Sequence, residues 1–181
     1  MYNSIQFITV NIDDIMQTSK EPLIFVVEDN QVYNKLVVSY LKSNKFTNVK
    51  DFLSGEECIK HLDEAPDIII QDYILDGING IEVLKHAKKK DPRIEFIFLS
   101  GQDSIDIAIN SMKYGAYDYI VKDQMALKKL VNKINKILTV KKLEKSNKRY
   151  RMGVIMFFVA LLVVILILMS LNVFFPKTFG F

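Results

Sequence analysis

DIIIQDYILDGING, residues 67–80, is the stretch that decides how the rest of the chain is interpreted. Its apolar run, Ile68 to Ile70, is short and rich in isoleucine, which is typical of a strand buried on both faces of a parallel sheet. A carboxylate, Asp72, follows the run, and after a loop with two glycines Ile81 begins an amphipathic helical pattern. We therefore expect Asp72 just beyond the carboxyl end of a central strand, where the ligand sites of open α/β sheets gather.

Four more short segments are predicted to be strands, and they alternate with helical patterns. The five predicted strands cover residues 23–27, 49–53, 68–70, 94–99 and 117–121. Apolar residues at i, i+3 and i+4 predict helices between them and a last helix from about residue 127 onward. This alternation predicts an α/β fold with a doubly wound, five-stranded parallel sheet. No strand–helix unit carries GxGxxG or a Walker lysine motif, so the sequence does not support nucleotide binding.

Polar side chains follow four of these strands at the point where each strand ends: Glu28, Asp29, Asp72, Ser100 and Lys122. Acids at strand ends are common loop residues, and one alone would carry no meaning. Three neighbouring carboxylates repel one another unless a cation lies between them, and hard oxygen ligands suit Mg²⁺. A hydroxyl and an ammonium opposite them can hold a phosphoryl group, and a free carboxylate can attack phosphorus.

The pattern resembles the receiver domain of two-component response regulators, over residues 22–140. The pieces that carry the resemblance are VVEDN (26–30), DIIIQDYILDGINGIEVL (67–84), IFLSGQD (97–103) and GAYDYIVKD (115–123). The resemblance implies a flavodoxin-like receiver fold and makes Asp72 the phosphoacceptor. It also implies a Mg²⁺ site in which Glu28, Asp29, Asp72 and the main-chain carbonyl of Ile74 are the protein ligands.

By the same resemblance, Ser100 takes the position of the switch hydroxyl, Lys122 that of the invariant lysine and Tyr119 that of the switch aromatic residue. Two residues depart from the family pattern, because Asp76 and Asp123 stand where the family usually has proline. A non-proline peptide bond strongly prefers trans, so we expect a rearranged loop after Lys122. Neither change removes a chemical group from the site, so we expect phosphorylation to survive.

The C-terminal part has a different composition. Residues 152–176 include no charged residue, and a stretch of this length predicts a transmembrane helix, assigned to residues 153–175. Residues 128–151 before it carry ten basic side chains and one acidic one. Basic residues beside a span favour the cytoplasmic side and attract anionic lipid. A solvated helix face is the plainer interpretation of this cluster, and a nucleic-acid patch is disfavoured by its position.

These patterns divide the chain into an N-terminal extension (1–21), a receiver domain (22–140), a basic juxtamembrane segment (141–152), the span (153–175) and a short tail (176–181). We expect a single-pass protein of the cytoplasmic membrane with its receiver in the cytoplasm. A sensor histidine kinase or phosphotransfer protein is the expected phosphodonor, and the switching face is expected to bind an unidentified protein or a second copy. We expect no DNA-binding or enzymatic output domain. The alternative is a structural adaptor whose receiver fold does not switch.

Overall fold

The computed structural model describes residues 21–174, without the side chains of Lys148, Arg149 and residues 171–174. The predicted tail and the predicted extension, except Glu21, lie outside the described residues. The chain divides into two compact units between Asn135 and Lys136.

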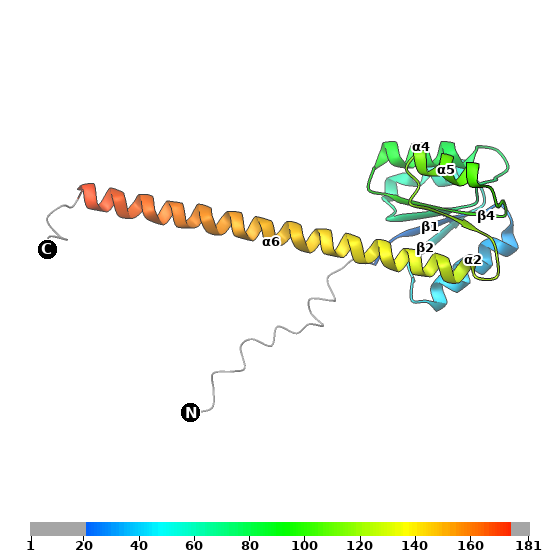
Figure 1. Ribbon diagram of the computed structural model, residues 1–181, viewed down its shortest axis with the longest axis horizontal. Coiled ribbons are helices and arrows are strands. Elements are labelled where there is room, and N and C mark those ends of the chain that lie inside the picture. The colour runs from blue at the N-terminus through cyan, green and yellow to red at the C-terminus, as the bar shows by residue number, and fades with distance from the viewer. Residues whose placement is uncertain (1–20, 175–181) are drawn as a thin grey trace, which may run out of the picture. The chain divides into compact units, whose positions relative to one another are not determined.

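The first unit is built on a five-stranded parallel sheet, as predicted (Figure 1). Its strands are β1 (Ile24–Val27), β2 (Val49–Phe52), β3 (Ile68–Gln71), β4 (Glu95–Ser100) and β5 (Asp118–Val121). Their spatial order is β2-β1-β3-β4-β5, and each neighbouring pair is parallel. The central strand is therefore β3, the strand that Asp72 follows. The strands whose ends carry the predicted site residues, β1, β3, β4 and β5, are consecutive neighbours.

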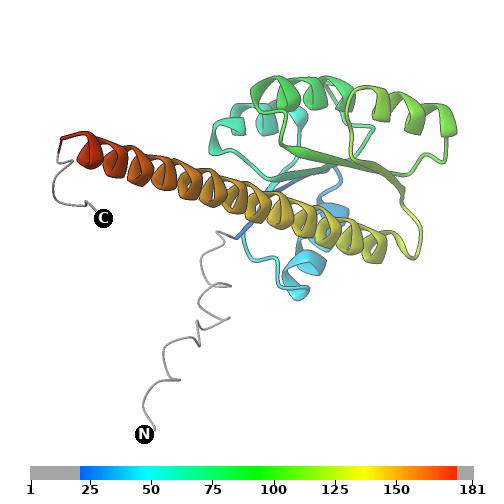
Figure 2. The same ribbon diagram turned by 60° about the vertical axis from the view of Figure 1, so that its left-hand side comes forward.

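Helices cover both faces of the sheet (Figures 1 and 2). One face carries α4 (Gly80–Lys90) and α5 (Ile105–Lys113), and α3 (Gly55–Lys60) packs beside α4. The other face carries α2 (Gln31–Ser43) and the first turns of α6, which begins at Ala126. After α3 a 3₁₀ turn, η1 (Leu62–Glu64), precedes β3.

Apolar side chains of the inner strands make the core. All four residues of β1 and of β3 are buried, which is why these strands read as continuous apolar runs instead of alternating ones. One buried cluster joins Phe25, Ile69 and Phe96 of the sheet to Val83 and Leu84 of α4. The edge strand β2 differs, since its two middle residues are exposed. Sheet packing therefore fixes the strand ends on which the candidate site is built.

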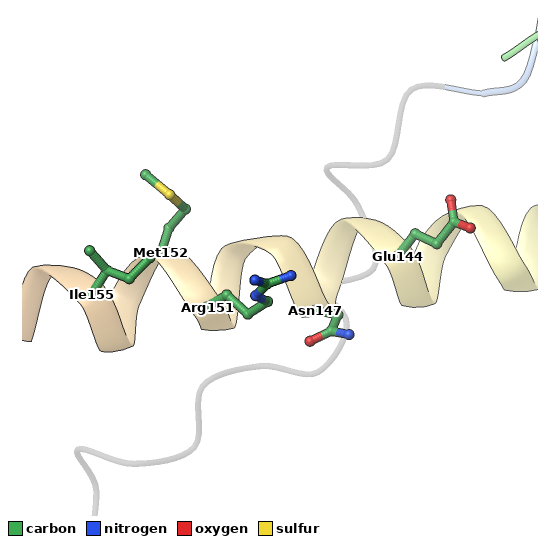
Figure 3. A pocket seen from close by; sticks show the side chains of 5 residues that line it. All are labelled: Glu144, Asn147, Arg151, Met152 and Ile155. Atoms are coloured by element: carbon green, nitrogen blue, oxygen red, sulfur yellow. The ribbon is translucent and has the colours of Figure 1, made fainter. Parts of the chain in front are cut away.

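The second unit, as far as it is described, is the remainder of α6, which ends at Phe174. This helix is long and apolar enough to cross a membrane, by length and composition. Figure 3 shows where its character changes, since Glu144, Asn147 and Arg151 precede Met152 and Ile155 along the helix. Among the described residues α6 alone lines the hollow between these side chains, and we place no ligand site there.

Candidate functional site

Three carboxylates meet at the carboxyl ends of β1 and β3. Glu28 and Asp29 follow β1, and Asp72 follows β3, which is paired with β1 in register. One oxygen from each lies within 4.8 Å of the other two. Glu28 is almost fully buried, whereas Asp29 and Asp72 are partly exposed. The cluster thus offers hard oxygen ligands that face an accessible side, a donor set that suits Mg²⁺.

Lys122 crosses the sheet edge from β5 to reach this cluster. Its Nζ donates to Asp72 Oδ2 at 2.5 Å and to Glu28 Oε2 at 2.7 Å. The backbone holds the residue in place, because Lys122 N donates to the Ser100 carbonyl at 2.7 Å. Charge-assisted hydrogen bonds of this kind are stronger than neutral ones. The predicted lysine and the predicted phosphoacceptor are therefore in direct contact.

Burial and charge act in opposite directions on the pKa values of Glu28 and Lys122. Loss of solvent raises the pKa of Glu28 above its ordinary value, and the hydrogen bond from Lys122 only partly offsets that effect. For Lys122, burial by itself disfavours the ammonium, but Asp72 and Glu28 outweigh it and hold the pKa above its usual value. Lys122 is therefore a permanent cation at neutral pH, directed at Asp72.

The predicted switch residues lie at the ends of β4 and β5. Ser100 is fully buried as the last residue of β4, one position later than the strand was predicted to end. Its Oγ accepts a hydrogen bond from Gln102 N at 3.2 Å, and the Tyr119 hydroxyl donates to the Gln102 carbonyl at 2.8 Å. The backbone of Gln102 thus links the hydroxyl position to the aromatic one.

Each departure from the family pattern has its own set of contacts. Asp76 is exposed, and its main-chain N–H donates to Asp29 Oδ2 at 3.2 Å. Asp123 accepts from Met125 N at 2.8 Å and from Lys129 Nζ at 2.6 Å. Within residues 21–174 no peptide bond is cis, as we expected after Lys122. The Asp123 side chain therefore holds this loop through two hydrogen bonds that a proline side chain could not accept.

Ile74 lies next to the acid cluster in the loop after β3. Its side chain is exposed, and its main-chain N–H donates to Asp72 Oδ1 at 3.2 Å. This contact keeps the residue beside the phosphoacceptor position. The role of the Ile74 carbonyl as a metal ligand stays a prediction.

Sequence reasoning missed three residues around the site. The Tyr33 ring lies 4.4 Å from Lys122 Nζ, measured to the ring centroid. Asn34 is buried and donates to the Glu28 and Phe52 carbonyls, which ties the start of α2 to two strand ends. Gln71 is buried with no hydrogen-bond partner for either amide atom among the described residues. Two of these residues have a sequence signal. Tyr33 lies four residues after Asp29, and Gln71 is an amide in an otherwise apolar strand.

This arrangement, an acid cluster with a bound lysine and a hydroxyl at the carboxyl edge of a five-stranded parallel sheet, defines a receiver-like protein. The model of the response regulator receiver domain family matches residues 24–135, more than half of the chain. The chain belongs to this family, and its receiver is a domain of two-component signalling.

Named relatives agree with this assignment. The chain is 31% identical over 115 residues to the transcriptional regulatory protein CssR of Bacillus subtilis, and the match covers 64% of this chain. It is 29% identical over 100 residues to the chemotaxis protein CheY of Listeria monocytogenes, which covers 55% of this chain and 84% of CheY. The chain spans only 50% of the length of CssR and 26% of an NtrX-like response regulator of Rickettsia felis.

A solved structure gives the same fold. The response regulator receiver domain protein of Clostridium thermocellum superposes with a TM-score of 0.62 at 27% identity. The superposition covers 67% of this chain and 98% of that one. The match is to a receiver domain over nearly its whole length, as the sheet order and the site geometry led us to expect.

Proposed function

We propose that this chain is a phosphorylation-controlled receiver in which Asp72 accepts a phosphoryl group from a sensor histidine kinase or a phosphotransfer protein. The observation that carries the proposal is the contact of Lys122 Nζ with both Asp72 and Glu28 inside the acid cluster. A single acid in a loop at a strand end is ordinarily solvated, whereas here a largely buried ammonium bridges two carboxylates. In the transfer step an Asp72 oxygen forms a bond to phosphorus while the bond from phosphorus to the donor nitrogen breaks.

Glu28, Asp29, Asp72 and the Ile74 carbonyl would hold Mg²⁺ at this site. The fit rests on the three carboxylates whose oxygens lie within 4.8 Å of one another. Bound Mg²⁺ would neutralise charge on the phosphoryl oxygens. Lys122 would donate to a phosphoryl oxygen, and its raised pKa favours the charged form that this needs. The buried Ser100 hydroxyl would donate to another such oxygen.

The switch that we propose begins at Ser100 and passes to Tyr119. A phosphoryl group on Asp72 would draw the Ser100 hydroxyl away from Gln102 N, and Tyr119 would lose its present partner at the Gln102 carbonyl. Ligands that bind one of two conformations better act in this way. The changed face would then bind a protein partner or a second copy of the chain.

The apolar part of α6 supports a membrane location for this receiver. Apart from small residues, the side chains from Val154 to Met169 are apolar and exposed on the helix. Exposing a continuous apolar surface of this size to water is unfavourable. The basic residues before them favour a cytoplasmic receiver and contact with anionic lipid. We propose a single-pass protein whose output is binding or phosphoryl relay at the cytoplasmic membrane.

The test of the phosphoacceptor uses the full chain in detergent micelles with acetyl phosphate, read by intact mass. We expect a phosphate adduct that needs Mg²⁺, disappears in Asp72→Asn and forms more slowly in Lys122→Met. Asp106→Asn, which changes an exposed acid in the first turn of α5, is the matched control. A folded protein that gains no adduct would contradict the proposal and favour the adaptor that does not switch.

A further inference from the structure

The Lys122 ammonium lies over the ring of Tyr33, a residue of α2. The Nζ atom lies 4.4 Å from the ring centroid, well within the range of a cation–π contact. Two carboxylates, Glu28 and Asp72, take hydrogen bonds from the same nitrogen. The side chain of Lys122 is only 18% exposed, so little of the ammonium is left to water. A cation–π contact is strongest where the cation has lost its water.

The backbone that carries Tyr33 is fixed on both sides of the residue. Asn30 caps α2, and its Oδ1 accepts from Val32 N at 3.0 Å and from Tyr33 N at 3.1 Å. The next residue, Asn34, is buried and donates to the Glu28 carbonyl at 3.2 Å and the Phe52 carbonyl at 3.1 Å. The ring is therefore presented from a helix start that is anchored to the ends of β1 and β2.

The charged groups that face Tyr33 come from several elements. Lys122 and Asp123 belong to the loop after β5, and Glu28 and Asp72 follow β1 and β3. Burial raises the pKa of the Tyr33 hydroxyl, the lysine lowers it, and the three carboxylates raise it further. The net effect is a phenol that stays neutral, so Tyr33 meets Lys122 with its ring and not with a phenolate.

We propose that Tyr33 is a positioning residue of the receiver site, which holds the Lys122 ammonium toward Asp72 through its ring. The inference rests on the proposed function and adds to it the group that keeps the lysine in place. A divalent cation among Glu28, Asp29 and Asp72 would compete with Lys122 for carboxylate oxygens. An aromatic face is not a ligand for such a cation, so the contact with Tyr33 persists when those oxygens are taken.

Two substitutions separate the ring from its hydroxyl. Tyr33→Phe keeps the aromatic face, and Tyr33→Leu keeps apolar bulk but removes that face. In the full chain in detergent micelles, with acetyl phosphate and saturating Mg²⁺, we expect Phe to phosphorylate within about twofold of wild type and Leu to be slower by about fivefold. Tyr33→Met serves as a second variant without a ring if Leu does not fold, which thermal unfolding checks. Tyr40→Leu, two turns further along α2, is the matched control.

The outcomes separate this inference from the proposed function. Loss of rate in Leu with rescue in Phe supports the positioning role, because a general packing defect would not depend on the aromatic face. Equal rates in wild type, Phe and Leu overturn the inference and leave the phosphoacceptor intact. Equally slow Phe and Leu overturn it too, since the hydroxyl would then be the group that matters. A wild type without adduct removes the proposed function, and the inference fails with it.

Discussion

Glu28 is a buried carboxylate whose pKa is raised by burial, although Lys122 donates a hydrogen bond to it. Its side chain is 4% exposed, and burial is the largest effect on its pKa, which lies above the ordinary 4.5. Removing one partner of a buried ion pair normally destabilises a protein, because the other charge is left without compensation. Here Lys122 keeps Asp72 as a second partner, so that penalty is reduced.

We therefore expect Glu28→Gln to raise the free energy of unfolding at pH 7 without Mg²⁺ by about 1 kcal/mol. A raised folded-state pKa means that the stabilising contribution of Glu28 is complete below pH 4.5 and is lost as the pH rises toward the folded-state pKa. The advantage of Gln should accordingly shrink in acid. Urea unfolding followed by tyrosine fluorescence measures both, with the exposed Glu57→Gln as control. Destabilisation at pH 7 would mean that the pair with Lys122 outweighs burial.

Gln71 presents a similar conflict without charge. Both amide atoms are buried, and neither has a hydrogen-bond partner among the described residues. An unpaired buried polar group costs about 1–3 kcal/mol, whereas methionine fills a similar volume without that cost. We expect Gln71→Met to raise the free energy of unfolding by about 1 kcal/mol. A loss of stability in the same urea experiment would reveal a bound partner for the amide, such as an ordered water.

At the level of elements, the sequence predicted the strands and the strand ends at which the candidate site residues lie, because both depend on local patterns. A short apolar run that is followed by a carboxylate, such as residues 68–72, predicts a buried strand and also a polar residue at the carboxyl end of that strand. The contact of Lys122 with Asp72 followed once β1, β3, β4 and β5 were assumed to be neighbours. The Tyr33 contact and the shared Gln102 backbone could not be predicted, since they depend on loop and rotamer geometry that no spacing rule encodes.

The start of α4 offers a test of how tightly that element packs on the sheet. A Cβ atom at Gly80 would lie 2.9 Å from Gln71 Nε2 and 3.0 Å from both Phe98 Cε1 and the Tyr73 carbonyl oxygen. We expect Gly80→Ala to destabilise the fold by about 2 kcal/mol, as overpacking does. Gly101→Ala is the matched control, because no atom lies within 4 Å of its Cβ position. Equal stability of the two variants by urea unfolding would contradict the close approach.

At the scale of the whole molecule, charge and apolar surface are segregated along the chain. Residues 128–151 have ten basic side chains and one acidic one, whereas the whole chain has a net charge of only +3. The receiver is consequently acidic, and the basic stretch of α6 leads into its apolar part. Anionic lipid attracts lysine and arginine near a membrane surface by about 1 kcal/mol each. Such a surface would attract the basic stretch and repel an acidic domain.

The apolar part of α6 is the feature on which the membrane location depends, and its centre gives the sharpest test. Val164 and Ile165 are about half exposed on the helix, at 51% and 49%. Lysine at the centre of a span costs about 2.5–3.5 kcal/mol per residue, so Val164→Lys with Ile165→Lys should oppose insertion strongly. We expect the wild type to remain in the membrane fraction after an alkaline wash and the double variant to be released. Leu143→Lys with Tyr150→Lys, which adds the same charge to the polar part of α6, should stay with the membrane. Release of the wild type itself would mean that this apolar surface is covered by protein, and the chain would then be held at its site of action by a partner instead of by lipid.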